Sequence, residues 1–176
     1  MTGVEALKAG ALLTLAALVQ VSIAEWIEVA EGHPDVVLVT LVAVALLRGP
    51  IFGAVSGFWV GLVLDTASFG TFGLTSLLLT IAGYWTGRFG EFTTRASAHP
   101  LLIAVAFATV GVALGSAVLH FMLGLTVPAS YLFLGVLLPT LALNMLLAYP
   151  LYGLCARLFP PRVPRIRPRE GVTAGV

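Results

Sequence analysis

Residues 48–65 read RGPIFGAVSGFWVGLVLD, a nearly apolar run that repeats glycine every four residues and ends on an acid. The spacing places Gly49, Gly53, Gly57 and Gly61 on one helical stripe, with Asp65 at its end. In water each interior glycine would cost a helix about 0.8–1 kcal/mol relative to alanine. In lipid, burial of apolar side chains does not drive helices together, and a side-chain-poor stripe lets another backbone approach closely. The stretch therefore predicts a membrane helix that packs tightly against a neighbour.

The composition of the whole chain indicates the same environment. Of the 176 residues, 59% are hydrophobic and only 10% are charged, and the mean hydropathy is +1.05. Such a chain lacks the polar surface that a soluble domain needs. The single cysteine, Cys155, excludes a disulfide framework and a paired-cysteine metal or redox motif.

Six apolar segments predict an all-α integral membrane protein with one six-helix transmembrane domain over residues 1–158. We expect the first segment to be retained as a span, because no small-residue cleavage site followed by a polar region ends it. Residues 159–176 are rich in proline and arginine and are expected to form a disordered basic cytoplasmic tail. The segments cover residues 7–27, 34–47, 50–64, 70–87, 100–124 and 131–158.

The second and third segments are short. About 14 residues reach only about 21 Å, against a hydrocarbon core of about 30 Å, so these two segments are expected to form a thin place or a re-entrant hairpin. The tip of this hairpin bears Arg48, whose side chain we expect to reach toward cytoplasmic headgroups. Pro34 and Pro50 each suit the first turn of the helix that follows a break.

The positions of the charged residues predict how the six spans are oriented in the membrane. With the amino terminus in the cytoplasm, all nine basic residues fall on the cytoplasmic side, as the positive-inside rule requires. Both termini are then cytoplasmic. The acids expected on the external side are Glu25, Glu28, Glu31, Asp35 and Asp65.

The glycine stripe has three candidate neighbours. The first is another helix of the same chain, either the fifth segment with its own small-residue face or the fourth segment with Gly83 and Gly87. The others are a second copy of the chain, forming a homodimer, and a single-span partner protein. The small residues of the fifth segment are Ala104, Ala108, Gly111 and Gly115.

Polar residues inside the apolar segments have local interpretations. Asp65 is expected to cap backbone amides of the next turn, and proton or cation handling is the alternative. His120 and Asn144 are each expected to make a local interhelical hydrogen bond. Pro34, Asp35, Arg48 and Asp65 are therefore candidates for structural or partner-docking roles.

Motifs for catalysis are missing from the sequence. It contains no HExxH, no GxSxG and no phosphate-binding loop, and Ser56 has no histidine expected at its depth. We expect no enzyme activity, no cofactor, no metal and no nucleic-acid partner.

Several motifs in one order resemble the rod shape-determining protein MreD family. The likeness is best over about residues 33–90 and is carried by His33-Pro-Asp35, by the break at Arg48-Gly-Pro50 and by two further motifs. These two are Gly53-x3-Gly57-Phe58-x2-Gly61-Leu-x2-Asp65 and Phe72-Gly-Leu-x-Ser-Leu77. The arginine-rich tail is a departure from the family pattern.

The resemblance implies a fold similar to the substrate-binding subunits of energy-coupling-factor vitamin transporters. It also implies a non-catalytic scaffold of the cell-elongation machinery, which supports lateral peptidoglycan synthesis and cell shape. Its direct partner would be MreC, a single-span protein, and its indirect partners MreB, RodA and a class B penicillin-binding protein. The glycine stripe and the external acidic rim would be docking surfaces for MreC, and membrane lipid would surround the rest.

A transporter subunit that binds a vitamin-type small molecule is the rival function. It would need an external pocket in which several polar groups converge. The sequence offers Gln20, Glu25, Asp65 and His120 for such a pocket.

Overall fold

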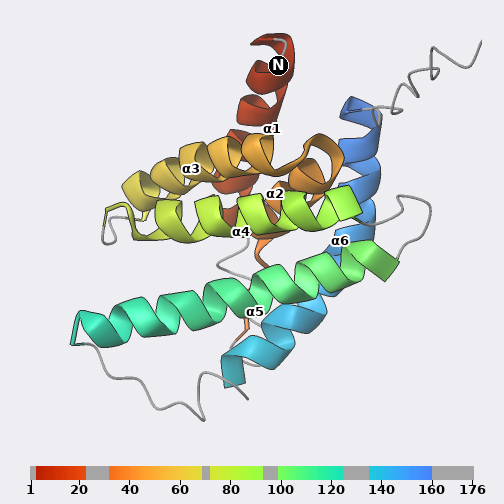
Figure 1. The fold of residues 1–176 in the computed structure, drawn as a ribbon. Helices are drawn as coiled ribbons and strands as arrows, with labels where there is room; N and C mark the ends of the chain where they lie inside the picture. Colours follow the sequence, from red (N-terminus) through yellow and green to blue (C-terminus); the bar gives the residue numbers. More distant parts are fainter. Residues whose placement is uncertain (1–2, 23–31, 69–71, 93–98, 125–134, 160–176) are drawn as a thin grey trace, which may run out of the picture.

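A computed structural model describes residues 3–22, 32–68, 72–92, 99–124 and 135–159. These residues form six helices, which confirms the all-α prediction (Figure 1). The external acids Glu25, Glu28 and Glu31 lie outside the described residues, and so does the tail beyond Phe159. The helices are α1 (Gly3–Ser22), α2 (Val36–Arg48), α3 (Pro50–Ala67), α4 (Leu74–Phe92), α5 (His99–Met122) and α6 (Leu138–Leu158).

Four of the helices, α1, α3, α5 and α6, are long and apolar enough to cross a membrane. The prediction that the third segment is short was wrong, because α3 continues through Asp65 to Ala67 and reaches 18 residues, or about 27 Å. Only α2, with 13 residues, stays as short as predicted. The fourth helix also runs further than predicted, to Phe92, because Arg88 and Glu91 pair on its surface instead of opening a loop.

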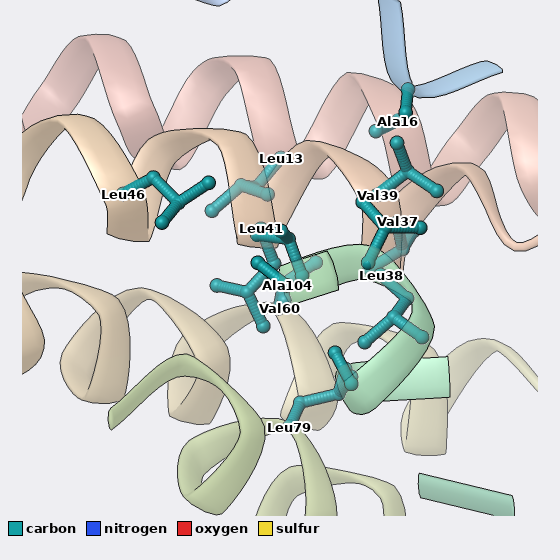
Figure 2. Packing of buried hydrophobic residues seen from close by; sticks show 14 of the residues in the cluster. Leu13, Ala16, Val37, Leu38, Val39, Leu41, Leu46, Val60, Leu79 and Ala104 are labelled. Atoms are coloured by element: carbon teal, nitrogen blue, oxygen red, sulfur yellow. The ribbon is translucent and has the colours of Figure 1, made fainter. Parts of the chain in front are cut away.

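Helix α2 is the centre of the bundle. Its sequence VVLVTLVAVALLR is apolar on every side, and every residue from Val37 to Leu47 is buried. A helix with no polar face is buried in its own protein or in lipid, and here α2 packs against each of the other five helices. Figure 2 shows its side chains interleaved with Leu13 and Ala16 of α1, Val60 of α3, Leu79 of α4 and Ala104 of α5.

Polar side chains from other helices hold the amino-terminal end of α2. The Gln20 Oε1 atom on α1 accepts a hydrogen bond from the Val37 amide at 2.9 Å. Asn144 on α6 accepts from the Asp35 amide at 2.8 Å and donates to Thr109 Oγ1 on α5 at 3.1 Å. The interhelical bond predicted for Asn144 is therefore confirmed.

The break before α2 differs from the prediction in one residue. Asp35 is the N-cap, and its Oδ1 atom accepts from the Leu38 amide at 2.9 Å. Pro34 therefore precedes the cap instead of opening the first turn, because the aspartate side chain satisfies an amide that a helix end leaves without a partner. The second break is as predicted: Gly49 adopts a φ of +96°, which glycine tolerates, and Pro50 opens α3.

Candidate functional site

The predicted glycine stripe lies in a seam between α3 and α4, which run side by side in opposite directions (Figure 1). Small residues on the two helices meet in order, one turn after another. A Cβ atom added at any of the three interior stripe glycines would collide with backbone atoms of α4. The facing pairs are Gly53 with Gly83, Gly57 with Leu79, and Gly61 with Ser76.

Along this seam the backbones of α3 and α4 are in direct contact. Without side chains at the stripe, carbonyl and amide groups of the two helices approach to van der Waals distance, which holds helices together in lipid. The hydroxyl of the buried Ser76 crosses the seam and donates to the Phe58 carbonyl at 3.0 Å. Ser76 was not among the predicted packing residues, although its spacing from Gly83 and Gly87 places all three along one face of α4.

Of the two intrachain neighbours considered, the fourth helix fills the seam and the fifth does not. Gly49 and Pro50 lie against Gly87 of α4, so the contact extends to the start of α3. On α5, Gly115 faces Leu78 of α4, whereas a Cβ atom at Gly111 would meet nothing within 4 Å. Gly111 therefore points away from the packed interior.

Asp65 lies at the end of the seam where α3 ends and α4 begins. Its carboxylate is buried and accepts hydrogen bonds from three backbone amides at the start of α4. Oδ2 accepts from Gly73 at 2.8 Å and from Ser76 at 3.3 Å, and Oδ1 accepts from Thr75 at 3.2 Å. A carboxylate suits this position, because the first amides of a helix lack partners and carry partial positive charge.

Arg48 lies at the other end of the seam, in the turn between α2 and α3. Its guanidinium pairs with Glu5 of α1 at 2.8 Å and lies 5.2 Å from the centre of the Phe159 ring at the end of α6. Only 5% of the Arg48 side chain is exposed, so the expectation that it reaches lipid headgroups was wrong. The ion pair and the ring replace part of the hydration that the charge loses, while the buried Nε atom of Arg48 has no hydrogen-bond partner among the described residues.

The Arg48 contacts also define one end of the bundle. They bring together the start of α1, the turn after α2 and the end of α6, while Gly87 near the end of α4 lies beside Pro50. The basic residues of the described part of the chain, Lys8, Arg48, Arg88 and Arg157, lie in the segments that meet at this end. Asp35 lies at the start of α2 and Asp65 near the end of α3, so each is at the end of its helix that is farther from Arg48.

The polar groups offered for a transport pocket do not converge. Gln20 binds the Val37 amide and Asp65 binds amides of α4, while Glu25 lies outside the described residues. His120 contacts Ser116 on its own helix, so its predicted interhelical bond was wrong. Within the described ranges, no group of three His, Cys, Asp or Glu side chains could hold a metal ion.

The family model of the rod shape-determining protein MreD matches residues 6–160 of the chain, which span nearly all of the six helices. No curated protein and no solved structure matches.

The seam makes Gly57 intolerant of any side chain. We expect Gly57→Ala to lower the free energy of unfolding by about 1–3 kcal/mol, because its new methyl group would press on the Leu79 backbone and force the helices apart. Reversible unfolding in mixed micelles measures this change. The matched control is Gly111→Ala, which enters open space and should be neutral or stabilising by up to about 1 kcal/mol. Equal losses for both variants would contradict the seam.

The carboxylate oxygens of Asp65 should contribute to the stability of the fold, because they accept backbone hydrogen bonds at the start of α4. We expect Asp65→Ala to lower the free energy of unfolding by about 1–3 kcal/mol, since buried amides of α4 lose their acceptor, and Asp65→Asn to lose less because one oxygen remains. The same unfolding assay tests both. Glu91→Gln, which alters an exposed ion pair, is the control and should change stability by less than about 1 kcal/mol. A neutral Asp65→Ala would disprove the capping role.

Proposed function

The chain belongs to the rod shape-determining protein MreD family, and from this membership we propose that it is a non-catalytic membrane scaffold of the bacterial cell-elongation complex. In this role it needs no cofactor and no nucleic acid, and it supports lateral peptidoglycan synthesis through the proteins that it holds. The observation that carries the proposal is the extent of the family match, because residues 6–160 include the packed helices and not only a short motif.

We further propose that all six helices form one transmembrane domain in the inner membrane, with both termini in the cytoplasm. The gathering of Lys8, Arg48, Arg88 and Arg157 at one end of the bundle supports this orientation. From the family resemblance we also propose a fold similar to energy-coupling-factor substrate-binding subunits. Beyond Phe159, which is buried, the basic tail would lie near anionic lipid.

MreC is the proposed direct partner, with MreB, RodA and a class B penicillin-binding protein reached through it. The α3 stripe is an unsuitable docking surface, because α4 already covers Gly53, Gly57 and Gly61. Gly111 on α5 is a better one: it is exposed, has open space at its Cβ position and lies near exposed Phe107 and Leu114. We propose that the single span of MreC packs against this side of α5, where the missing side chain allows close approach.

Cell shape tests the proposed role directly. In a rod-shaped bacterium depleted of its own MreD, expression of this chain should restore rods, and an empty vector should leave rounded cells. Microscopy gives the aspect ratio of the cells, and immunoblotting shows that the chain is present. Round cells that contain the folded chain would contradict the proposal.

Photocrosslinking tests the proposed surface. With a photoreactive aromatic residue placed at Gly111, illumination of cells should join the chain to MreC, because this position is open and exposed. The matched control places the same residue at Ile81, which is exposed on α4, and should give no such product. Capture of MreC from Ile81 but not from Gly111 would move the interface to α4 while leaving the scaffold role intact.

A further inference from the structure

An exposed pair of opposite charges lies near the carboxyl-terminal end of α4. Arg88 Nη1 donates to Glu91 Oε2 at 2.8 Å, and the two side chains are 50% and 43% exposed. The Arg88 guanidinium also lies 4.9 Å from the centre of the exposed Phe92 ring, which holds it along the surface of the helix. The bond to Glu91 uses one of the five N–H groups of the arginine, and the half-exposed guanidinium presents others to its surroundings.

Aromatic side chains adjoin this charge pair on the side toward the middle of α4. Tyr84 and Trp85 are 44% and 58% exposed, and their rings meet edge to face with centroids 6.1 Å apart. Tyr84 precedes Arg88 by four residues and Trp85 precedes it by three, so both lie on the same side of the helix as the charge pair. Tyrosine and tryptophan are enriched where hydrocarbon meets lipid headgroups. This part of α4 therefore has the composition of a membrane–water boundary.

The two charges lie at different depths. Helix α4 lies lengthwise beside α3, which is long and apolar enough to cross a membrane (Figure 1). From the middle of α4 toward its carboxyl-terminal end, Arg88 comes first, and Glu91 follows about 4.5 Å farther along the helix. The cation is therefore nearer the hydrocarbon, and the anion is nearer the water. A phospholipid with an amino headgroup carries the opposite charges in the same order, because its phosphate adjoins the glycerol and its ammonium lies farther out.

We propose that Arg88 and Glu91 form a headgroup site for a zwitterionic aminophospholipid, of which phosphatidylethanolamine is the type. Arg88 donates to the lipid phosphate, Glu91 accepts from the primary ammonium, and the upper part of the acyl chains lies along Tyr84 and Trp85. An exposed ion pair contributes little to stability, so the two side chains can exchange their mutual contact for contacts with the lipid. Phosphatidylglycerol would bring negative charge beside Glu91, and the quaternary ammonium of phosphatidylcholine has no N–H group to donate.

Trp85 can report on this site, because it lies three residues from Arg88. A Trp26→Phe/Trp59→Phe variant leaves Trp85 as the only tryptophan of the chain. A second variant also carries Trp85→Phe and Phe107→Trp, which moves the reporter to an exposed position on α5. Residues 103–111 around that position include no charged residue, so the second variant is the matched control.

The experiment compares headgroups at the two reporters. Each purified variant is reconstituted into mixtures of phosphatidylethanolamine, phosphatidylcholine and phosphatidylglycerol with identical acyl chains. The chains of one lipid at a time are brominated, and fluorescence quenching gives relative binding constants. At Trp85 we expect phosphatidylethanolamine to bind about two- to fivefold more tightly than either other lipid, which is the range for one exposed charge pair. The Phe107→Trp reporter should show no such preference. Equal preferences at the two reporters would overturn the proposal, and so would tighter binding of phosphatidylglycerol or phosphatidylcholine at Trp85.

Reversing the order of the charges provides the causal control. Arg88→Glu/Glu91→Arg keeps both charges and the net charge but places the anion nearer the hydrocarbon, so the preference for phosphatidylethanolamine at Trp85 should be lost. Glu91→Gln should remove the advantage over phosphatidylcholine, because a neutral amide binds an ammonium more weakly than a carboxylate does. This single change decides the outcome if the reversed variant does not fold. An undiminished preference in the folded variants would overturn the proposal, and so would a Trp85 that none of the brominated lipids quenches.

Discussion

A helix enclosed on every side by other helices must find partners for its polar ends inside the protein, and this constraint governs the bundle. Around the partly buried start of α2, Gln20 from α1 and Asn144 from α6 accept hydrogen bonds from backbone amides, and the Asp35 side chain accepts a third. At its other end Arg48 pairs with Glu5. These contacts fix where α1, α5 and α6 meet α2, because each bond is directional in a way that apolar packing is not.

The α3–α4 pair uses a second means of association. In lipid the apolar faces of two helices gain nothing from mutual burial alone, so close backbone contact has to supply the attraction. Gly57 against Leu79 gives that contact, and Ser76 and Asp65 add hydrogen bonds that cross between the helices. The stretch from Gly53 to Asp65 is thus one continuous packing element, with a stripe of glycines along it and an amide-binding carboxylate at its end.

Much of this could be predicted from the sequence, because the signals were local. Glycines four residues apart define one face, Gly49-Pro50 marks a break, and an acid after a long apolar run suggests a cap. The identity of the facing helix could not be predicted, since periodicity describes a surface and not what meets it. The burial of Arg48 was missed for a related reason: its partners, Glu5 and Phe159, are far away in the chain. Arg88 and Glu91 suggested a loop, although their spacing also suits a helix.

The surroundings of Arg48 also bear on how the protein is made. The guanidinium lies over the ring of Phe159, and α2 packs against α6, which follows the other described helices in the chain. During translation the α2–α3 hairpin leaves the ribosome long before Phe159 does. The charge of Arg48 and the first amides of the central helix therefore lack some of their partners until α6 has been made. Completion of the core thus depends on α6, and a chain cut short before α6 would lack the contacts of Asn144 and Phe159.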